Sequence, residues 1–234
     1  MYSPKTFLAL ACLALALCGC RKPAAEAPAQ SSPTPAGAAA SPAAAKDQPG
    51  DDLSTVAVRI LKTAHRQGGV VLRGDCGPRG ISEKYSLPRP VTLEPMDKAL
   101  AEVSAKYQNI YWRESPASGV RVGDSTATAR LLRVRVREFH IVEDREPDGV
   151  MAVLWRTPEV RVFLRRNHVR FASRPETARK AISPPMIVEV KNATVADILD
   201  RIAAGYRADP PKVWTYLECA NSANKEMLVD VRMK

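Results

Sequence analysis

The chain has 234 residues and a formal net charge of +10, from 35 Lys and Arg residues against 25 Asp and Glu. This length is enough for one ordinary core or for two small modules packed together, and the positive charge favours anionic partners through its general field. The three histidines lie far apart, and the sequence has neither Gly-x-Ser-x-Gly nor a phosphate-binding glycine loop. These features exclude the metal and hydrolase classes that carry a recognisable motif, and they predict no cofactor.

The first 20 residues have the three parts of an export signal. Lys5 contributes a positive charge, residues 7–17 are apolar, and small residues lead up to Cys20. The apolar stretch of about 11 residues is typical of a signal core and well short of the roughly 20 residues that a membrane-spanning helix needs. We therefore predict a signal peptide over 1–19 rather than a buried segment of the fold.

The end of this segment, Leu17-Cys18-Gly19-Cys20, resembles the bacterial lipobox. The resemblance implies cleavage before Cys20, a diacylglycerol on its sulfur and an acyl chain such as palmitate on its amine. Several acyl chains would anchor the protein to a membrane almost permanently. In enterobacterial lipoproteins an Asp after the cysteine signals retention in the inner membrane. Arg21 therefore implies the outer membrane, with the protein facing the periplasm.

Residues 20–50 are dominated by Pro, Ala, Ser, Gln and Gly. Recurrent prolines prevent a stable helix and nothing large is available to bury, which predicts a disordered tether. About 30 such residues have a coil dimension of roughly 30 Å, enough to hold a folded domain clear of the lipid headgroups. A periplasmic location would also remove nucleic acid from the partners of this basic chain.

Two cysteines, Cys76 and Cys219, remain in the folded part once the signal peptide is removed and Cys20 is lipidated. In an oxidising compartment such a pair predicts one disulfide. It would close a loop of roughly 140 residues, worth about 4–5 kcal/mol in the chain-entropy model. The alternative is two unrelated cysteines, one buried and one exposed. A redox-active pair is disfavoured because no Cys-x-x-Cys spacing is present.

The remaining residues, 51–234, predict a periplasmic domain of the α+β class, with repeated β-α-β modules, a central β-hairpin and flanking helices. Apolar residues at helical spacing predict a helix over 56–64, and 70–72 is typical of a strand. Thr157 followed by Pro158 predicts the start of another helix.

Two segments, 88–113 and 185–217, share a predicted β-α-β pattern. In each, an apolar strand precedes an amphipathic helix, and an aromatic strand with a tryptophan follows; the first strand is predicted over 90–93. Thr194 is a natural N-cap for the second helix. The apolar residues of the two helices match at a constant offset of about 99 residues. The alternative is two ordinary amphipathic helices.

The second segment resembles the short N-terminal module of secretins and TonB-dependent receptors. The resemblance rests on hydrophobic spacing between two apolar strands, with these residues in order: Asn192, Thr194, Ile198, Leu199, Ile202, Ala203 and Gly205. In those families the module mediates contacts within envelope assemblies and is not an enzyme. The resemblance implies the same kind of role for this chain.

A β-hairpin is predicted between the two segments. Apolar residues alternate with arginines over 132–137, residues 143–149 are rich in turn formers, and the apolar run 150–155 is typical of a return strand.

The alternation in this hairpin predicts that Arg133, Arg135 and Arg137 form a row on one face of a strand. Alternate strand residues repeat at about 6.6 Å, which suits a carboxylate or sulfate array. One interpretation is that an acidic partner docks on these three arginines. The other is a solvated sheet face, or one paired with acidic residues across the hairpin.

Together these features predict a non-enzymatic, lipid-anchored periplasmic protein that acts as a binding or assembly module in the bacterial envelope, with an envelope protein as its partner. One alternative is a protein that binds an anionic glycan, either peptidoglycan or lipopolysaccharide. The other is a hydrolase with an unrecognised site, for which Ser222 and Lys225 match Ser-x-x-Lys without companion motifs.

Overall fold

Helices and strands follow one another throughout the part of the chain that the structure describes. The computed structural model describes residues 50–78, 80–88, 91–115, 119–145, 147–173, 181–221 and 225–234, all within one unit, 45–234. These residues contain five α-helices and eleven strands, so the predicted α+β class is confirmed. The predicted signal peptide, Cys20 and the tether up to residue 49 lie outside the described residues.

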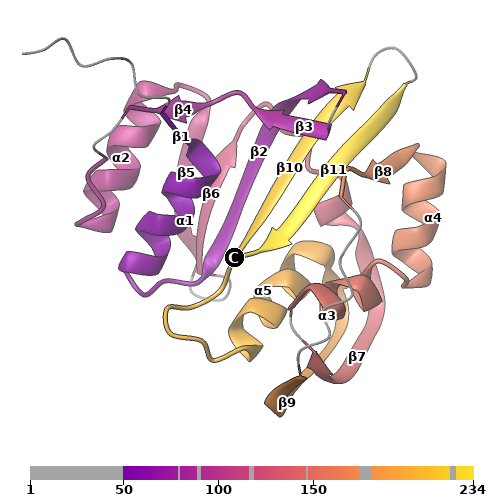
Figure 1. Cartoon of the computed structure of the whole chain (residues 1–234). Helices are drawn as coiled ribbons and strands as arrows, with labels where there is room; N and C mark the ends of the chain where they lie inside the picture. Colours follow the sequence, from indigo (N-terminus) through magenta and orange to yellow (C-terminus); the bar gives the residue numbers. More distant parts are fainter. Residues whose placement is uncertain are drawn as a thin grey trace, which may run out of the picture. The chain divides into compact units, whose positions relative to one another are not determined.

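The elements are numbered in chain order (Figure 1). The helices are α1 (Leu53–Thr63), α2 (Met96–Lys106), the 3-10 turn η1 (Leu131–Arg133), α3 (Pro147–Leu154), α4 (Pro158–Arg166) and α5 (Val195–Gly205). The strands are β1 (Asp51–Asp52), β2 (Gly68–Gly77), β3 (Gly80–Glu83), β4 (Ser86–Leu87), β5 (Ile110–Ser115), β6 (Gly119–Asp124), β7 (Arg135–Arg145), β8 (Val169–Phe171), β9 (Ala181–Thr194), β10 (Val213–Asn221) and β11 (Glu226–Met233).

One seven-stranded mixed sheet runs through the described part of the chain. Its order is β5-β6-β2-β10-β11-β8, with β3 paired to β2. Strands β6, β2 and β10 are parallel neighbours, β8 is parallel to β11, and the pairs β5–β6, β10–β11 and β2–β3 are antiparallel. Two further antiparallel pairs, β1–β4 and β7–β9, form separate small sheets.

Two hydrophobic cores lie on opposite faces of the large sheet. One contains the buried sides of α1 and α2 with Val70 and Val213, and the other contains those of α3 and α5 with Val71 and Trp214. Because successive strand residues point to opposite faces, these neighbouring residues place the two cores on opposite sides. Figure 1 shows α1 and α2 beside the β5–β6–β2 part, and α3, α4 and α5 beside β10, β11 and β8. Helices α1 and α2 therefore cover one face of the sheet, and α3 and α5 cover the opposite face.

The strand pairing repeats along the chain. In residues 51–124, β1 pairs with β4, and β5, β6 and β2 are neighbours; in residues 135–233, β7 pairs with β9, and β10, β11 and β8 are neighbours with the same relative directions. We call these two segments the N-module and the C-module. The parallel pair β2–β10 joins them into one sheet.

The two predicted β-α-β units are not confirmed. In the first, residues 91–93 are not in a strand, and residues 89–90 lie outside the described part. In the second, the strands β9 and β10 that flank α5 belong to different sheets, so the helix does not connect two strands of one sheet. The helices themselves are present as α2 and α5, and they hold equivalent places in the N-module and the C-module.

The predicted central hairpin is wrong. Strand β7 pairs with β9 instead, and the predicted return strand over 150–155 lies mostly in helix α3. Val150, Met151 and Leu154 are almost completely buried, because α3 packs against both β7 and α5. A helix that is buried on several sides has an apolar run like that of a buried strand, so periodicity alone does not separate the two.

The helix predicted after Thr157 is confirmed as α4, and the predicted N-cap of α5 is Thr194. The Thr194 hydroxyl accepts a hydrogen bond from the Asp197 backbone N–H at 3.2 Å, and the Asp197 carboxylate accepts one from the Thr194 backbone N–H at 3.0 Å. This reciprocal capping box satisfies free N–H groups of the first turn and fixes where α5 begins.

Candidate functional site

A groove of 560 Å³ lies where the N-module meets the C-module. Its floor is the face of β5 and β6 opposite to the one that α1 and α2 cover. Its walls are η1, the N-terminal end of α5 and the loop that follows β6. This volume is within the usual range for small-molecule sites.

Tyr111 and Arg113 of β5 form the floor together with Gly123 and Arg121, their cross-strand partners on β6. The Tyr111 ring packs directly on Gly123, since a Cβ at that glycine would lie 2.5 Å from the ring's Cζ and Oη atoms. Tyr111 is 40% exposed. The glycine therefore lets an aromatic ring rest against the strand with one side open to the groove, next to a cross-strand pair of arginines.

Arg121 is tied to the C-module by the buried Asp200 of α5. The Nη2 atom of Arg121 donates to Oδ2 of Asp200 at 2.7 Å, and Nε1 of Trp214 donates to Oδ1 at 2.7 Å. The guanidinium also lies over the Trp214 ring, 4.3 Å from its centroid, in a cation–π contact. The side chains of Arg121 and Asp200 are only 12% and 6% exposed. A buried ion pair therefore joins the two modules beneath the groove.

Burial raises the pKa of Asp200 to about 6, although the Arg121 charge and the hydrogen bonds from Trp214 and Arg121 act in the opposite direction. Removing water disfavours the charged form of a carboxyl group, and the negative charge of Asp197 adds to this effect. The pair beneath the groove is thus ionised at neutral pH, and Asp200 takes up a proton as the pH falls through about 6.

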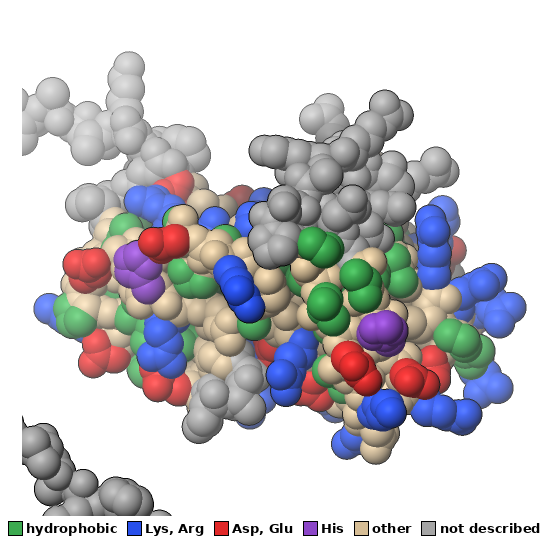
Figure 2. Space-filling model, turned by 90° about the horizontal axis from the view of Figure 1, so that it is seen from below, with side chains coloured by type: hydrophobic (Ala, Val, Ile, Leu, Met, Phe, Trp, Pro, Cys, Tyr) green, Lys and Arg blue, Asp and Glu red, His purple; other side chains and the backbone are tan. Residues whose placement is uncertain are grey.

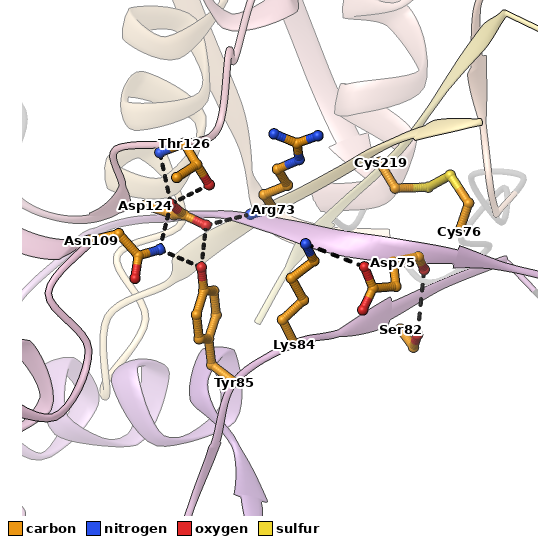
Figure 3. Close-up of polar contacts among 10 residues, drawn as sticks. All are labelled: Arg73, Asp75, Cys76, Ser82, Lys84, Tyr85, Asn109, Asp124, Thr126 and Cys219. Atoms are coloured by element: carbon orange, nitrogen blue, oxygen red, sulfur yellow. Dashed lines mark hydrogen bonds and ion pairs between the residues drawn. A yellow bond between two sulfur atoms is a disulfide. The ribbon is translucent and has the colours of Figure 1, made fainter. Parts of the chain in front are cut away.

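Asp124, the last residue of β6, holds the loop at one end of the groove (Figure 3). Its carboxylate accepts hydrogen bonds from the Thr126 backbone N–H at 2.7 Å, the Tyr85 hydroxyl at 2.8 Å, the Asn109 amide at 2.8 Å and the Arg73 backbone N–H at 3.4 Å. Burial alone raises the pKa of Asp124, but these hydrogen bonds outweigh it and hold the pKa below its usual value. Asp124 therefore stays ionised, and its carboxylate has a structural role because both of its oxygens accept hydrogen bonds.

A second buried carboxylate, Glu218 of β10, holds the same loop from the C-module. It accepts hydrogen bonds from the backbone N–H groups of Thr128 and Ala129 and, at 2.9 Å, from the Tyr216 hydroxyl. Burial and the Glu218 charge raise the pKa of Tyr216 above its ordinary value, so this phenol stays protonated and remains a donor. The rim of the groove is thus fixed by one carboxylate from each module.

The wall of the groove formed by η1 and α5 is held by a backbone hydrogen bond. The Val195 backbone N–H at the start of α5 donates to the Val134 carbonyl at 2.9 Å, which places α5 beside η1. Arg133 of η1 and Asp197 of α5 both line the groove from this side. The Asp197 carboxylate is engaged in the capping box.

The groove lining carries three arginines and three acidic residues, so its formal charges balance. The two sets differ in how many of their side chains already have a partner. The acidic side chains are engaged: Asp124 and Asp197 as described, and Glu114 in a 3.0 Å ion pair with Arg66. Within the described part of the chain, the side chains of Arg113 and Arg133 make no ion pair or hydrogen bond. The groove therefore offers two guanidiniums without a partner among the described residues, whereas each of its carboxylates has at least one.

The structure separates the three arginines that the sequence places in one row. Arg133 belongs to η1 and lines the groove, whereas Arg135 and Arg137 begin β7. The Arg135 guanidinium donates to the Asn192 carbonyl at 2.9 Å, and the Arg137 backbone N–H donates to Glu159 at 3.3 Å. The predicted row is wrong for Arg133, because the chain turns at η1 before the strand begins.

Basic side chains also gather elsewhere on the surface. Figure 2 shows several of them at the end of the molecule where α4 lies in Figure 1. Arg161, Arg165 and Arg166 of that helix are exposed.

Sequence reasoning missed the groove residues Tyr111, Arg113 and Arg121. Arg121 and its partner Asp200 are 79 residues apart in the chain. No local pattern connects them, and the parallel pairing of β2 with β10 joins the sheet segments to which they belong. One local signal was present: Gly123 lies within the apolar–polar alternation of β6, and glycines often occur in a strand where a large side chain approaches the backbone.

The structure brings the Sγ atoms of Cys76 and Cys219 to a disulfide distance of 2.00 Å (Figure 3). The bridge links β2 of the N-module to β10 of the C-module. It lies beyond the last paired residues of the two strands, Arg73 and Glu218.

The remaining sequence candidates do not form a site with these residues. The three histidines are all exposed: His65 lies in the turn after α1, His140 in β7 and His168 in the turn before β8. Ser222 is outside the described residues. Within the described ranges, no group of three or more His, Cys, Asp or Glu side chains is placed to hold a metal ion. No described helix is both long and apolar enough to cross a membrane.

Comparisons of the chain with protein-family models, with curated proteins and with solved structures give no match.

Proposed function

We propose that this chain is a lipid-anchored, non-enzymatic protein of the bacterial envelope that binds an anionic partner in the groove between its two modules. The free guanidiniums of Arg113 and Arg133 carry the proposal, because they have no partner among the described residues, whereas each carboxylate of the groove has at least one. Charge-assisted hydrogen bonds from arginine to a carboxylate or phosphate are among the strongest that proteins make.

The bonding around the groove supports binding rather than catalysis. Both oxygens of Asp200 are engaged, by Arg121 and Trp214, and this carboxylate is buried beneath the floor. Asp124 and Glu218 fix the rim in the same manner. These bonds hold the backbone around the groove in place, so binding has to order mainly the side chains of Arg113 and Arg133.

The N-terminal sequence supports lipid anchoring at Cys20. Replacing Cys20 with alanine should release the protein from membranes, because its acyl chains provide the attachment. Cell fractionation with a high-salt wash measures this, and Cys18→Ala, which keeps a small residue in the lipobox, is the matched control. A Cys20→Ala variant that stays in the washed membrane fraction contradicts lipid anchoring.

The groove is tested by reversing its two free charges. Arg113→Glu with Arg133→Glu should abolish recovery of the partner from crosslinked envelope extracts, and binding by the unaltered protein should weaken as salt is raised. The control is Arg135→Glu with Arg137→Glu, which changes the net charge equally but lies outside the groove lining.

Equal losses from both double variants would mean that the general positive field attracts the partner. A loss confined to the control pair would place the site on the strand β7. Only a loss confined to Arg113 and Arg133 supports the groove.

A second candidate function, binding of an anionic glycan, is favoured by one observation. The exposed Tyr111 ring lies beside the free Arg113 on the groove floor.

A further inference from the structure

The groove floor offers side chains rather than backbone groups to a ligand. It is the face of β5 and β6, and the backbone N–H and C=O groups of paired strands lie in the plane of the sheet, where they bond to neighbouring strands. A peptide that binds by strand addition uses the free backbone groups of a sheet edge. The outer edge of β5 has no strand partner in the described sheet, but it lies in the plane of the sheet and not on the face that forms the groove floor. A ligand on this face therefore meets side chains.

Several backbone N–H groups at the start of α5 are already bonded. The capping box uses those of Thr194 and Asp197, and the Val195 N–H donates to the Val134 carbonyl. The charged donors that the groove presents to a ligand are the guanidiniums of Arg113 and Arg133, one on the floor and one on the wall.

Tyr111 and Arg113 are two residues apart on the same face of β5, a spacing of about 6.6 Å along the strand. One sugar ring spans this distance. Pyranose rings present C–H bonds on their faces, and an aromatic face is electron-rich, so the two attract each other when they stack. The Tyr111 ring is held in place from below by Gly123, which leaves its other side free for such a contact.

We infer that the groove binds a carboxylated sugar, with the ring of the sugar on Tyr111 and its carboxylate between Arg113 and Arg133. The inference rests on the proposed function, because it names the anion that the groove takes. The required combination is a flat C–H face beside a single negative charge. A neutral sugar lacks the charge, and an acidic peptide lacks the face.

The test uses the protein purified from membranes in detergent and isothermal titration calorimetry at low salt. Three probes separate the chemistry: trigalacturonate, which has rings and carboxylates; chitotriose, which has rings alone; and tetraglutamate, which has carboxylates alone. We expect trigalacturonate to bind and the other two to bind at least tenfold more weakly, since each loses one class of contact worth about a factor of ten.

Variants locate the binding in the groove. Tyr111→Ala and Arg113→Gln should each weaken trigalacturonate binding about tenfold, and Tyr111→Phe should retain it. Gly123→Ala should also weaken binding while keeping the tyrosine, because the new methyl group would lie 2.5 Å from the ring and displace it. Arg161→Gln on the exposed face of α4 is the control and should have no effect.

Each outcome decides between the two proposals. If tetraglutamate binds as tightly as trigalacturonate, and Arg113→Gln weakens both while Tyr111→Ala weakens neither, the groove binds anions but the sugar assignment is wrong. If no probe binds, the sugar assignment also fails, and the charge-reversal test then decides on the groove itself. If trigalacturonate binds equally to all variants, it binds outside the groove.

Discussion

Replacing Arg121 with methionine lowers the free energy of unfolding by about 3–5 kcal/mol near pH 8, because it leaves the Asp200 carboxylate buried without its counter-ion. The pair joins β6 of the N-module to α5 of the C-module, and the two side chains are among the least exposed charged groups of the described residues. Chemical denaturation measures the loss.

The size of this loss should depend on pH. Burial already raises the pKa of Asp200 to about 6 in the folded protein, and loss of the Arg121 charge raises it further. A carboxyl group with a raised folded pKa binds more protons when folded, so its contribution to stability falls as the pH rises from its unfolded value of about 4. The difference between the natural protein and Arg121→Met therefore grows with rising pH and becomes constant once Asp200 is ionised in both.

Two further variants control for the change in packing. Asp200→Asn in the Arg121→Met background removes the stranded charge and should recover part of the lost stability at high pH. Arg66→Met breaks the exposed ion pair with Glu114, in which the side chains are 39% and 48% exposed, and should cost at most about 1 kcal/mol. A loss from Arg121→Met that is as small as this, or that does not change with pH, contradicts a buried pair.

Removing the bridge between Cys76 and Cys219, by Cys76→Ala with Cys219→Ala, lowers the free energy of unfolding by about 4–5 kcal/mol. The two cysteines are 143 residues apart, so the bond closes a loop that contains most of the domain. It also crosses from the N-module to the C-module. Chemical denaturation with and without reductant measures the effect.

Reductant should destabilise the natural protein and leave the double variant unchanged. The bond is expected to form in the oxidising compartment to which the proposed signal peptide directs the chain. Titration of the unfolded, non-reduced protein purified from membranes should then find no free thiol. Two free thiols would show that the cysteines are not bonded in the cell.

The helices could be predicted from the sequence where one face alone is buried. Apolar residues at helical spacing indicate α1, α2 and α5, and Thr157 with Pro158 indicates the start of α4. Helix α3 could not be predicted in this way, because its apolar residues are buried against both β7 and α5 and give no clear period.

Strand pairing was the main feature that local patterns could not supply. Strands β9 and β10 flank one helix yet belong to different sheets, while β2 and β10, far apart in the sequence, are parallel neighbours. The groove depends on that second pairing. Its residues come mainly from β5, β6, the loop after β6, η1 and α5, and in sequence they are ordinary members of their own segments. The sequence indicated Arg133 as a candidate because of its charge. Its position in the groove depends on the turn η1, which the alternation of apolar residues does not predict.

The central claim is that the partner binds in the groove, and capture of the partner at Tyr111 in living cells tests it most directly. A photo-crosslinking benzophenone amino acid is placed at Tyr111 in one strain and at Ile187, an exposed residue outside the groove lining, in another. We expect a crosslinked anionic envelope component at position 111 alone, and we expect it to disappear when Arg113→Glu and Arg133→Glu are added. Capture at position 187 alone, or capture at 111 that survives both charge reversals, would contradict the account.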